Sequence, residues 1–199
     1  NWYRWLKLLR GVESLKIPRW YSTKLGTESR SSTELHIFVD TGEDAYAAVA
    51  YLRISDTEGT ECSLVGSKAR VSPLRYLSNT RKELSAAVLR SRLMNNVKDR
   101  SLKIERKIIL SDSTTVLTWL HSEHKRYLQF VAHRVGEILE STDLTEWRWV
   151  PTKLNVADEA TKWGKTPTFD ASSRWFIGPE FLKQPEAEWP LQKIIIPNG

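Results

Sequence analysis

The chain has 199 residues, 40% of them hydrophobic and nine of them Trp, which suffices for one domain with a core and short appendages. Its 30 Lys and Arg outnumber its 24 Asp and Glu, and the net charge of +6 is compatible with a polyanionic partner but indicates one only weakly. The single cysteine, Cys62, excludes an internal disulfide and favours an intracellular protein. No apolar run is long enough to span a bilayer and no signal-peptide pattern opens the chain, so we expect no membrane partner.

The first part of the chain, residues 1–33, is predicted to be a tether or packing arm. It opens with an amphipathic helical piece whose apolar residues are Trp2, Trp5, Leu8 and Leu9. Residues 17–20, which contain a proline, end this piece, and a stretch rich in Ser, Thr and Gly follows. Because the first residue is Asn1 and not Met, we expect the chain to be a segment of a longer polypeptide.

Three strands are predicted next. The first is the apolar run that ends at Asp40, the second covers residues 45–54, and the third covers residues 61–71. The polar link over residues 55–60 indicates that the second and third strands form a hairpin. In the crossover order described below, this hairpin extends a sheet antiparallel to the first strand.

A helix over residues 81–97 follows, because Ala86, Leu89 and Leu93 fall on one helical face. The remaining predicted elements are a strand over residues 107–111, helices that carry residues 116–120 and 128–138, a strand over 146–150 and a short helix over 156–162. The order β-β-β-α-β-α-α-β-α contains no internal repeat. From residue 165 onward, prolines and scattered aromatic residues indicate an extended tail that packs against something.

Four carboxylates stand at the ends of these elements: Asp40, Glu83, Asp112 and Asp158. A strand–helix–strand crossover usually builds a parallel pair, and ligands collect at the carboxyl ends of parallel strands. If their strands are neighbours, Asp40 and Asp112 face one another, and like charges that close need a cation. Oxygen ligands of this kind suit magnesium, and two such ions can drive an in-line phosphodiester displacement.

Each acid also has a structural interpretation. Glu83 stands in a capping-box pattern, Asp112 can cap the helix after it, and Asp158 stands at a helix start. Asp40 can serve a turn. Taken singly, the structural interpretation is favoured for each residue, but four coincidences in this element order are much less expected than one shared site.

A rival motif is Asp40-Thr41-Gly42, which matches the signature of aspartic proteases. That fold is mostly β structure and needs an apolar-apolar-Gly segment well downstream. Residues 64–66 offer such a segment too early, and the predicted helix over residues 81–97 does not belong to that fold. We therefore set the protease interpretation aside.

Beyond the acids, several motifs occur in a recognisable order along the chain. They are Trp2-x-x-Trp5, Asp40 with the run over 45–49, residues 67–74 ahead of Glu83-Leu84, Asp112-Ser113-Thr114, Trp147-x-x-Val150-Pro151 through Asp158, and Trp175-x-x-Gly178-Pro179. Single motifs are weak signals, but the ordered series resembles the ribonuclease H domain of the Pol polyprotein of BEL/Pao long-terminal-repeat retrotransposons. The resemblance covers nearly the whole chain.

This resemblance implies an α/β fold of the ribonuclease H-like type, a five-stranded mixed sheet flanked by helices. It implies three parts: a connection segment over residues 1–33, the ribonuclease H-like domain over 34–164 and a tail toward integrase over 165–199. It further implies that Asp40, Glu83, Asp112 and Asp158 hold two Mg²⁺ or Mn²⁺ ions. These ions would serve to cut the RNA strand of an RNA/DNA hybrid, with the reverse transcriptase portion of the same polyprotein as partner. The implied location is intracellular, in a cytoplasmic virus-like particle or the nucleus.

A second hypothesis from another class is a domesticated copy, catalytically weak or inactive, kept as a nucleic-acid or protein binding module. Candidate phosphate contacts remain open, because a solvated helix face explains them equally well. They are Arg81, Lys82, Arg90, Arg92, Lys125 and Arg126. Trp119, Trp147 and Trp149 are expected in the core rather than in contact with bases.

Overall fold

A computed structural model describes most of the chain. The described residues are 2–22, 31–74, 77–98 (without side chains at 95–98), 103–122, 127–162 and 170–190. Within them, no helix has the length and apolar character needed to cross a membrane. Lys125 and Arg126 lie outside the described residues.

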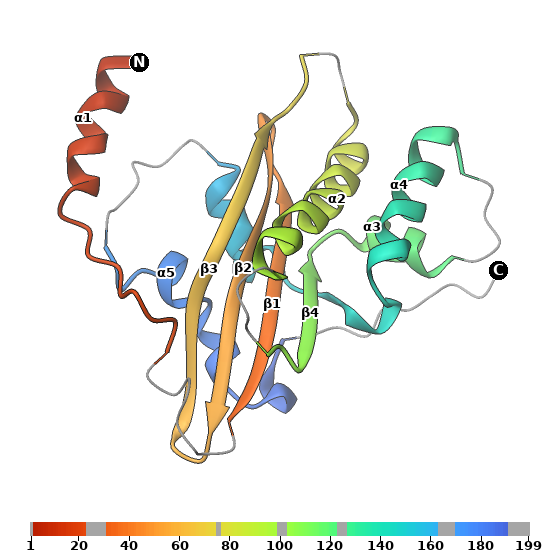
Figure 1. The fold of residues 1–199 in the computed structure, drawn as a ribbon. Helices are drawn as coiled ribbons and strands as arrows, with labels where there is room; N and C mark the ends of the chain where they lie inside the picture. Colours follow the sequence, from red (N-terminus) through yellow and green to blue (C-terminus); the bar gives the residue numbers. More distant parts are fainter. Residues whose placement is uncertain are drawn as a thin grey trace.

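The first helix, α1 (Trp2–Val12), stands apart from the sheet in Figure 1 and contains no buried residue. Tyr21 and Ser22, further along the same segment, contact β3 (Gly59–Val71). Ser63 donates its hydroxyl to the Tyr21 carbonyl, and Ser22 donates to the Glu61 carboxylate at 2.5 Å. The amino-terminal segment is therefore attached to the outer edge of the sheet after α1 ends.

The sheet has five strands in the order β3-β2-β1-β4-β5 (Figure 1). The other four are β1 (Ser32–Thr41), β2 (Ala45–Asp56), β4 (Arg106–Ser111) and β5 (Trp147–Trp149). Antiparallel pairs join β1 to β2 and β2 to β3, whereas β4 lies parallel to both β1 and β5. The predicted five-stranded mixed sheet is thus confirmed, with the strands of Asp40 and Asp112 as neighbours.

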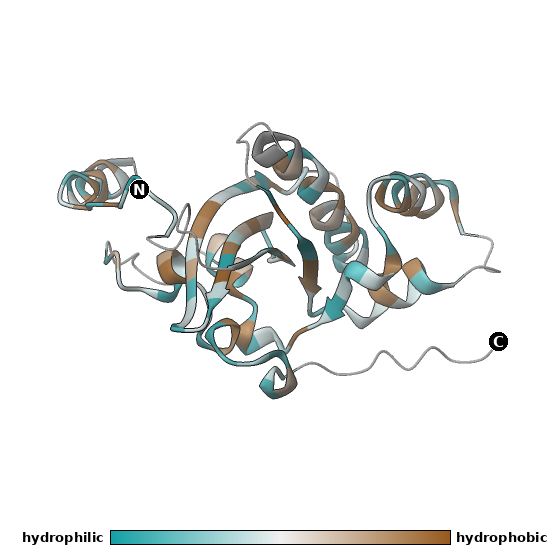
Figure 2. Cartoon of the chain, turned by 60° about the horizontal axis from the view of Figure 1, so that its bottom comes forward, coloured by the Kyte–Doolittle hydropathy of each residue, from teal (hydrophilic) through white to brown (hydrophobic). Residues whose placement is uncertain are grey.

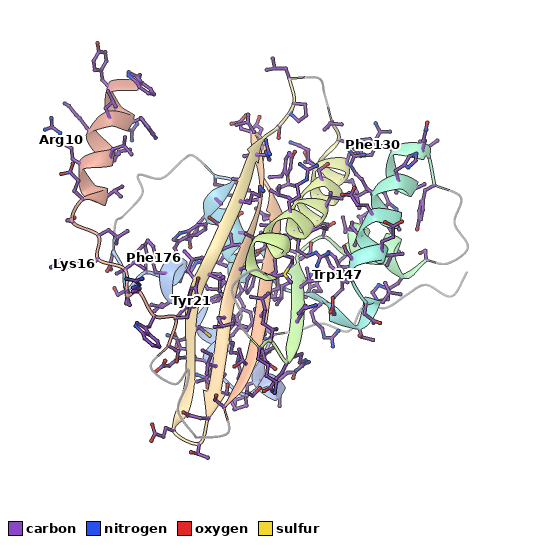
Figure 3. All side chains as sticks on the ribbon, in the orientation of Figure 1. Arg10, Lys16, Tyr21, Phe130, Trp147 and Phe176 are labelled. Atoms are coloured by element: carbon purple, nitrogen blue, oxygen red, sulfur yellow. The ribbon has the colours of Figure 1, made fainter. Side chains whose placement is uncertain are left out.

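Helices α2 (Asn79–Lys98), α3 (Thr114–His121) and α4 (Gln129–Ser141) pack on one face of the sheet. Figure 2 shows brown, hydrophobic stretches along the central strands and on the helices beside them. Trp147 is buried in this core (Figure 3), and Trp119 and Trp149 pack against it while partly exposed. Leu128 was expected inside a helix. It is instead the residue just before α4, and it is 74% exposed.

The opposite face is covered by short helices, several of them within residues 170–190. These elements are η2 (Thr152–Leu154), η3 (Val156–Ala160), α5 (Arg174–Ile177), η4 (Glu180–Lys183) and η5 (Glu186–Glu188), while η1 (Leu144–Glu146) precedes β5. The helix predicted over 156–162 is the shorter η3, a 3₁₀ helix closed by three-residue bonds such as Asp158 N–H to Asn155 O. Leu182 and Trp189 are buried against this face, so residues 170–190 pack on their own sheet.

Candidate active site

The parallel pairing of β1 and β4 brings two of the predicted acids to one edge of the sheet. Val39 and Ser111 are register partners, and Asp40 and Asp112 are the residues that directly follow them. The strand order therefore places these two carboxylates at the carboxyl ends of adjacent parallel strands, where ligand sites of α/β sheets are usually found.

Asp40 is 6% exposed and accepts a hydrogen bond of 2.6 Å from the hydroxyl of buried Thr161. Burial, together with the negative charges of Asp112 and Asp158, raises the pKa of Asp40 to about 7, although the Thr161 hydroxyl and the Thr41 amide act in the opposite direction. The ionised carboxylate is thus poorly compensated by the protein itself.

Asp112 is held by the last residue of β5 and by a residue of the segment after it. The side-chain amide of Asn155, fully buried, donates to the Val39 carbonyl at 2.9 Å and to Asp112 Oδ1 at 3.3 Å. Trp149 donates its indole N–H to the Asp112 carbonyl at 3.1 Å. Asn155 also caps η3 by accepting from the Ala157 amide, so one side chain connects β1, Asp112 and the helix that carries Asp158.

Ser113, and not Asp112, is the N-cap of α3. Its hydroxyl oxygen accepts from the Val116 amide at 3.1 Å, while the hydroxyl donates to Glu83 Oε2 at 2.6 Å. Glu83, in α2, therefore has as its hydrogen-bond partner the residue that follows Asp112. Sequence reasoning missed this role, although a Ser next to a predicted acid at a helix start is a recognisable cap signal.

Asp158 lies in η3 and forms an ion pair of 2.5 Å with the ammonium of Lys162, four residues later. The hydrogen bond to Asp158 and the charges of Asp158, Asp40 and Asp112 raise the pKa of Lys162. Its side chain is 61% exposed, so the pair itself is weak. Thr161 and Lys162 were not predicted, yet both stand one turn after Asp158.

The structure brings Asp40, Asp112 and Asp158 within electrostatic reach of one another, and Glu83 joins them through Ser113. Within the part of the chain that the structure describes, no three His, Cys, Asp or Glu side chains stand close enough together to hold a metal ion. Instead, the carboxylates accept hydrogen bonds from other side chains of the protein: Asp40 from Thr161, Asp112 from Asn155 and Glu83 from Ser113. Asp158 forms an ion pair with Lys162. Their assignment as metal ligands remains a prediction.

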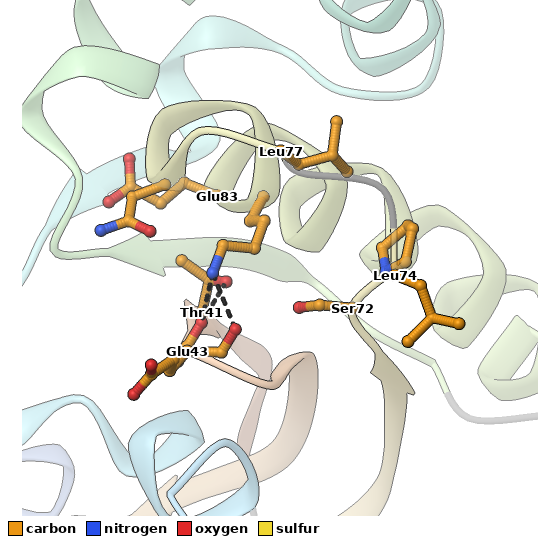
Figure 4. A pocket seen from close by; sticks show the side chains of 10 residues that line it. Thr41, Glu43, Ser72, Leu74, Leu77 and Glu83 are labelled. Carbon is orange, nitrogen blue, oxygen red and sulfur yellow. Dashed lines mark hydrogen bonds between the residues drawn. The ribbon is translucent and has the colours of Figure 1, made fainter.

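A pocket of about 660 Å³ lies beside Glu83, between the β1–β2 turn and the start of α2 (Figure 4). In it the ammonium of Lys82 donates to the carbonyls of Gly42 at 3.1 Å and Glu43 at 2.8 Å, drawn as dashed lines in Figure 4. Lys82 thus fixes the turn rather than pointing into solvent. Arg90 is 1% exposed and donates to Ser141, so it is also no surface phosphate contact.

Gly42 is required by the close approach of the β1–β2 turn to the end of η3. A Cβ atom at this position would stand 2.5 Å from the Thr161 carbonyl oxygen, a distance that real Cβ contacts do not reach. The glycine that resembles an aspartic-protease signature therefore serves packing between Asp40 and Thr161 in an α/β fold.

Comparison with known proteins identifies a family for this chain. The model of the Pao retrotransposon-like RNaseH-like domain matches residues 1–113, more than half of the chain. No curated protein matches the sequence.

Solved structures show low similarity. LC11-RNase H1 in complex with an RNA/DNA hybrid is 13% identical with a TM-score of 0.43, and the match covers 64% of this chain and 92% of that one. RNase H1 from Halobacterium salinarum is 14% identical with a TM-score of 0.40, over 65% and 92%. The RNase H domain of rv2228c from Mycobacterium tuberculosis, solved as a fusion with maltose-binding protein, is 15% identical with a TM-score of 0.39, over 62% and 86%.

The family match extends from α1 through β1 to β4 and includes Asp40, Glu83 and Asp112. It agrees with the five-stranded mixed sheet and with the order of motifs along the chain. The chain therefore belongs to the family of Pao retrotransposon-like domains with a ribonuclease H-like fold.

Proposed function

We propose that this domain is a metal-dependent endonuclease that cuts the RNA strand of RNA/DNA hybrids, with Asp40, Glu83, Asp112 and Asp158 as the ligands of two Mg²⁺ or Mn²⁺ ions. The observation that carries the proposal is the environment of Asp40. Burial and the charges of Asp112 and Asp158 raise the pKa of this carboxyl to about 7. A buried acid whose pKa is raised this far by burial and by neighbouring acids is a recurrent property of functional sites.

The donor set fits hard divalent ions, which prefer carboxylate oxygens. Held by these four acids, such ions would supply an activated water and charge stabilisation at the leaving 3′ oxygen. The chain's own residues supply the orientation: Thr161 holds Asp40, Asn155 holds Asp112, and Ser113 holds Glu83. Outer hydrogen bonds of this kind fix ligand geometry and strengthen metal binding. The exposed side chain of Lys162 can turn away from Asp158 without disturbing the core.

A pair of arginines supports a polyanionic substrate. The guanidiniums of Arg81, in the first turn of α2, and Arg134, in α4, lie 5.0 Å and 3.6 Å from the centre of the Phe130 ring. Among the described residues, neither forms a salt bridge with a carboxylate. Two neighbouring cations on a ring that holds them in place are suited to a backbone phosphate. The partner would be the hybrid, delivered by a reverse transcriptase portion of the same polypeptide.

The test is cleavage of a hybrid with labelled RNA, in Mg²⁺, in Mn²⁺ and in EDTA, beside labelled duplex DNA. We expect cleavage of the hybrid in either metal, none in EDTA and none of the duplex DNA. Asp143→Asn is the matched control for Asp40→Asn, because exposed Asp143 caps η1 and Asn caps about as well as Asp.

Absence of hybrid cleavage in both metals at high protein concentration, with retained binding of hybrid, would favour the inactive binding module. Cleavage that persists in EDTA would reject the metal-dependent reaction. Arg81→Ala and Arg134→Ala should weaken hybrid binding and reduce its dependence on salt by about one phosphate contact each.

A further inference from the structure

Residues 170–190, here the C-terminal strap, run along the sheet face opposite α2. Leu182 and Trp189 of the strap are buried against that face, among residues such as Phe38 and Leu110. Tyr51, in β2, donates its phenol hydroxyl to the Trp175 carbonyl at 2.7 Å. The strap is therefore joined to the sheet along its length.

One end of the strap is fixed at the amino-terminal end of β1. Arg53 donates to the Leu182 carbonyl at 2.7 Å and to the Gln184 carbonyl at 3.3 Å. Arg106 forms two hydrogen bonds with Glu186, at 2.5 Å and 2.7 Å. Such charge-assisted, two-point contacts define both position and direction.

The other end of the strap contacts the segment that carries Asp158. Arg174, the first residue of α5, donates from Nη1 to the Lys153 carbonyl in η2 at 2.8 Å, and its Nε is hydrogen-bonded to the Glu159 carboxylate in η3. One guanidinium therefore connects two successive turns, η2 and η3. Arg has this fork of donors, whereas Lys has a single ammonium.

The two turns that Arg174 connects enclose residues that hold the acids of the site. Asn155, between η2 and η3, contacts Asp112, and Thr161, just after η3, contacts Asp40. Asp158 is in η3, next to Glu159. The turns η2 and η3 are short 3₁₀ helices of three and five residues that meet at Asn155, and the Arg174 guanidinium adds a side-chain link between them.

We propose that Arg174 is a positioning residue of the nuclease site, and that the C-terminal strap is in this way a functional part of the domain. Arg174 holds η2 and η3 in one arrangement and so keeps Asp158, Asn155 and Thr161 in register with Asp40 and Asp112. This inference rests on the proposed function for its effect on cleavage, but the arrangement of the segment can be measured without it.

The experiment compares Arg174→Ala, Arg174→Lys and Lys183→Ala by hydrogen exchange in EDTA and by hybrid cleavage in Mg²⁺. Lys183 is the matched control, because it belongs to the same strap and pairs with Glu180 within η4. The Arg174 and Glu159 side chains are 38% and 37% exposed, so their ion pair alone contributes little, and local opening should change only on the order of fivefold.

We expect faster exchange over residues 152–161 in Arg174→Ala, a partial effect in Arg174→Lys and parent-like exchange in Lys183→Ala. Exchange in β1 should be unchanged in all three, which separates local positioning from global destabilisation. For cleavage, kcat should fall on the order of tenfold in Arg174→Ala with an unchanged KM, since a small misplacement of an acid affects the chemical step.

Exchange over 152–161 that is the same in Arg174→Ala and Lys183→Ala would overturn the inference. So would a loss of protection spread over the whole sheet. A parent chain that does not cleave hybrid would reject the proposed function, whereas the exchange measurement in EDTA would still decide whether Arg174 positions the segment.

Discussion

Strand β1 carries two buried carboxylates on the same sheet face whose ionisation is shifted in opposite directions. Glu34 is 7% exposed and Asp40 is 6% exposed, so both residues are buried. Burial by itself raises the pKa of Glu34, but the hydrogen bond from His36 and the charges of His36, Arg53 and Arg106 outweigh it and lower this pKa to about 2. At Asp40 the neighbours are acids, and the pKa is raised to about 7.

His36 clarifies where the compensating charge at Glu34 comes from. Complete burial, with two arginines nearby, lowers the pKa of His36, so the imidazole is neutral near pH 7 and donates from Nε2 at 3.0 Å. Near pH 7 the charge that stabilises ionised Glu34 is therefore that of the guanidiniums of Arg53 and Arg106, at 3.1 Å and 3.4 Å. The comparison teaches that partners shift the ionisation of two buried acids on one strand in opposite directions, and the acid with the raised pKa is the one proposed for the site.

The largest expected effect comes from removing the charge of Asp40, at the end of β1 where the neighbouring side chains are acids. Asp40→Asn should lower hybrid cleavage more than about a hundredfold, since even residues behind the metal ligands cost 10–100-fold. Its melting temperature in EDTA should be unchanged or higher, because Asn keeps a polar partner for Thr161 without the unfavourable charge. Melting and cleavage assays on the same preparations check this. Normal cleavage by Asp40→Asn would remove Asp40 from the site.

Glu34→Gln tests the end of β1 where arginines surround the acid. It should lower stability and leave cleavage intact, the reverse of the result expected for Asp40→Asn. It leaves Arg53 without its carboxylate partner, and breaking such a buried pair costs about 3 kcal/mol. Unfolding by urea should show this loss, with magnesium-dependent cleavage retained at low temperature. A variant as stable as the parent would show that the arginines find other partners and that the contrast with Asp40 is smaller than the structure indicates.

Gly42→Ala sharpens the comparison by displacing a partner of Asp40 without touching any charge. The added Cβ meets the Thr161 carbonyl, and overpacking of this kind costs about 1–3 kcal/mol. Cleavage should fall by roughly tenfold as Thr161 and η3 move away from Asp40. Gly136→Ala is the control, because a Cβ there meets no atom within 4 Å and helix propensity favours Ala. Equal activity of both variants would contradict the role of this contact.

The smallest effect concerns pH, measured in EDTA. The pKa of Asp40 is raised in the folded chain from 3.8 to about 7, so its contribution to stability falls as pH rises through this interval. The pKa of Glu34 is lowered from 4.5 to about 2, so its contribution is present above pH 4.5 and is lost as pH falls through this lower interval. Between pH 5 and 8, Asp40→Asn should gain melting temperature over the parent by about 3–6 °C. A constant difference across that range would contradict the raised pKa.

The sequence alone predicted the strands, the helices and the position of each acid at the end of an element. This succeeds because apolar periodicity and turn residues act over a few neighbours, and because adjacent parallel strands end at one edge. The prediction that Asp40 and Asp112 lie side by side follows from that logic, and the strand order agrees with it. The ends of the helices were predicted less exactly. Leu128, predicted inside a helix, is the residue just before α4, and its neighbours in the sequence do not determine whether its side chain is buried.

Only the tertiary structure decided which partner each side chain has. Glu34 meets arginines that are 19 and 72 residues away, and Thr161 meets Asp40 across 121 residues. Such contacts depend on strand register and on how η3 and the strap pack, and no local pattern specifies them. The same reason explains why Arg90, which looks like a surface cation in sequence, lies inside the protein. Residue order determined where charges occur, whereas packing determined which of them meet an opposite charge and which lie beside like charges.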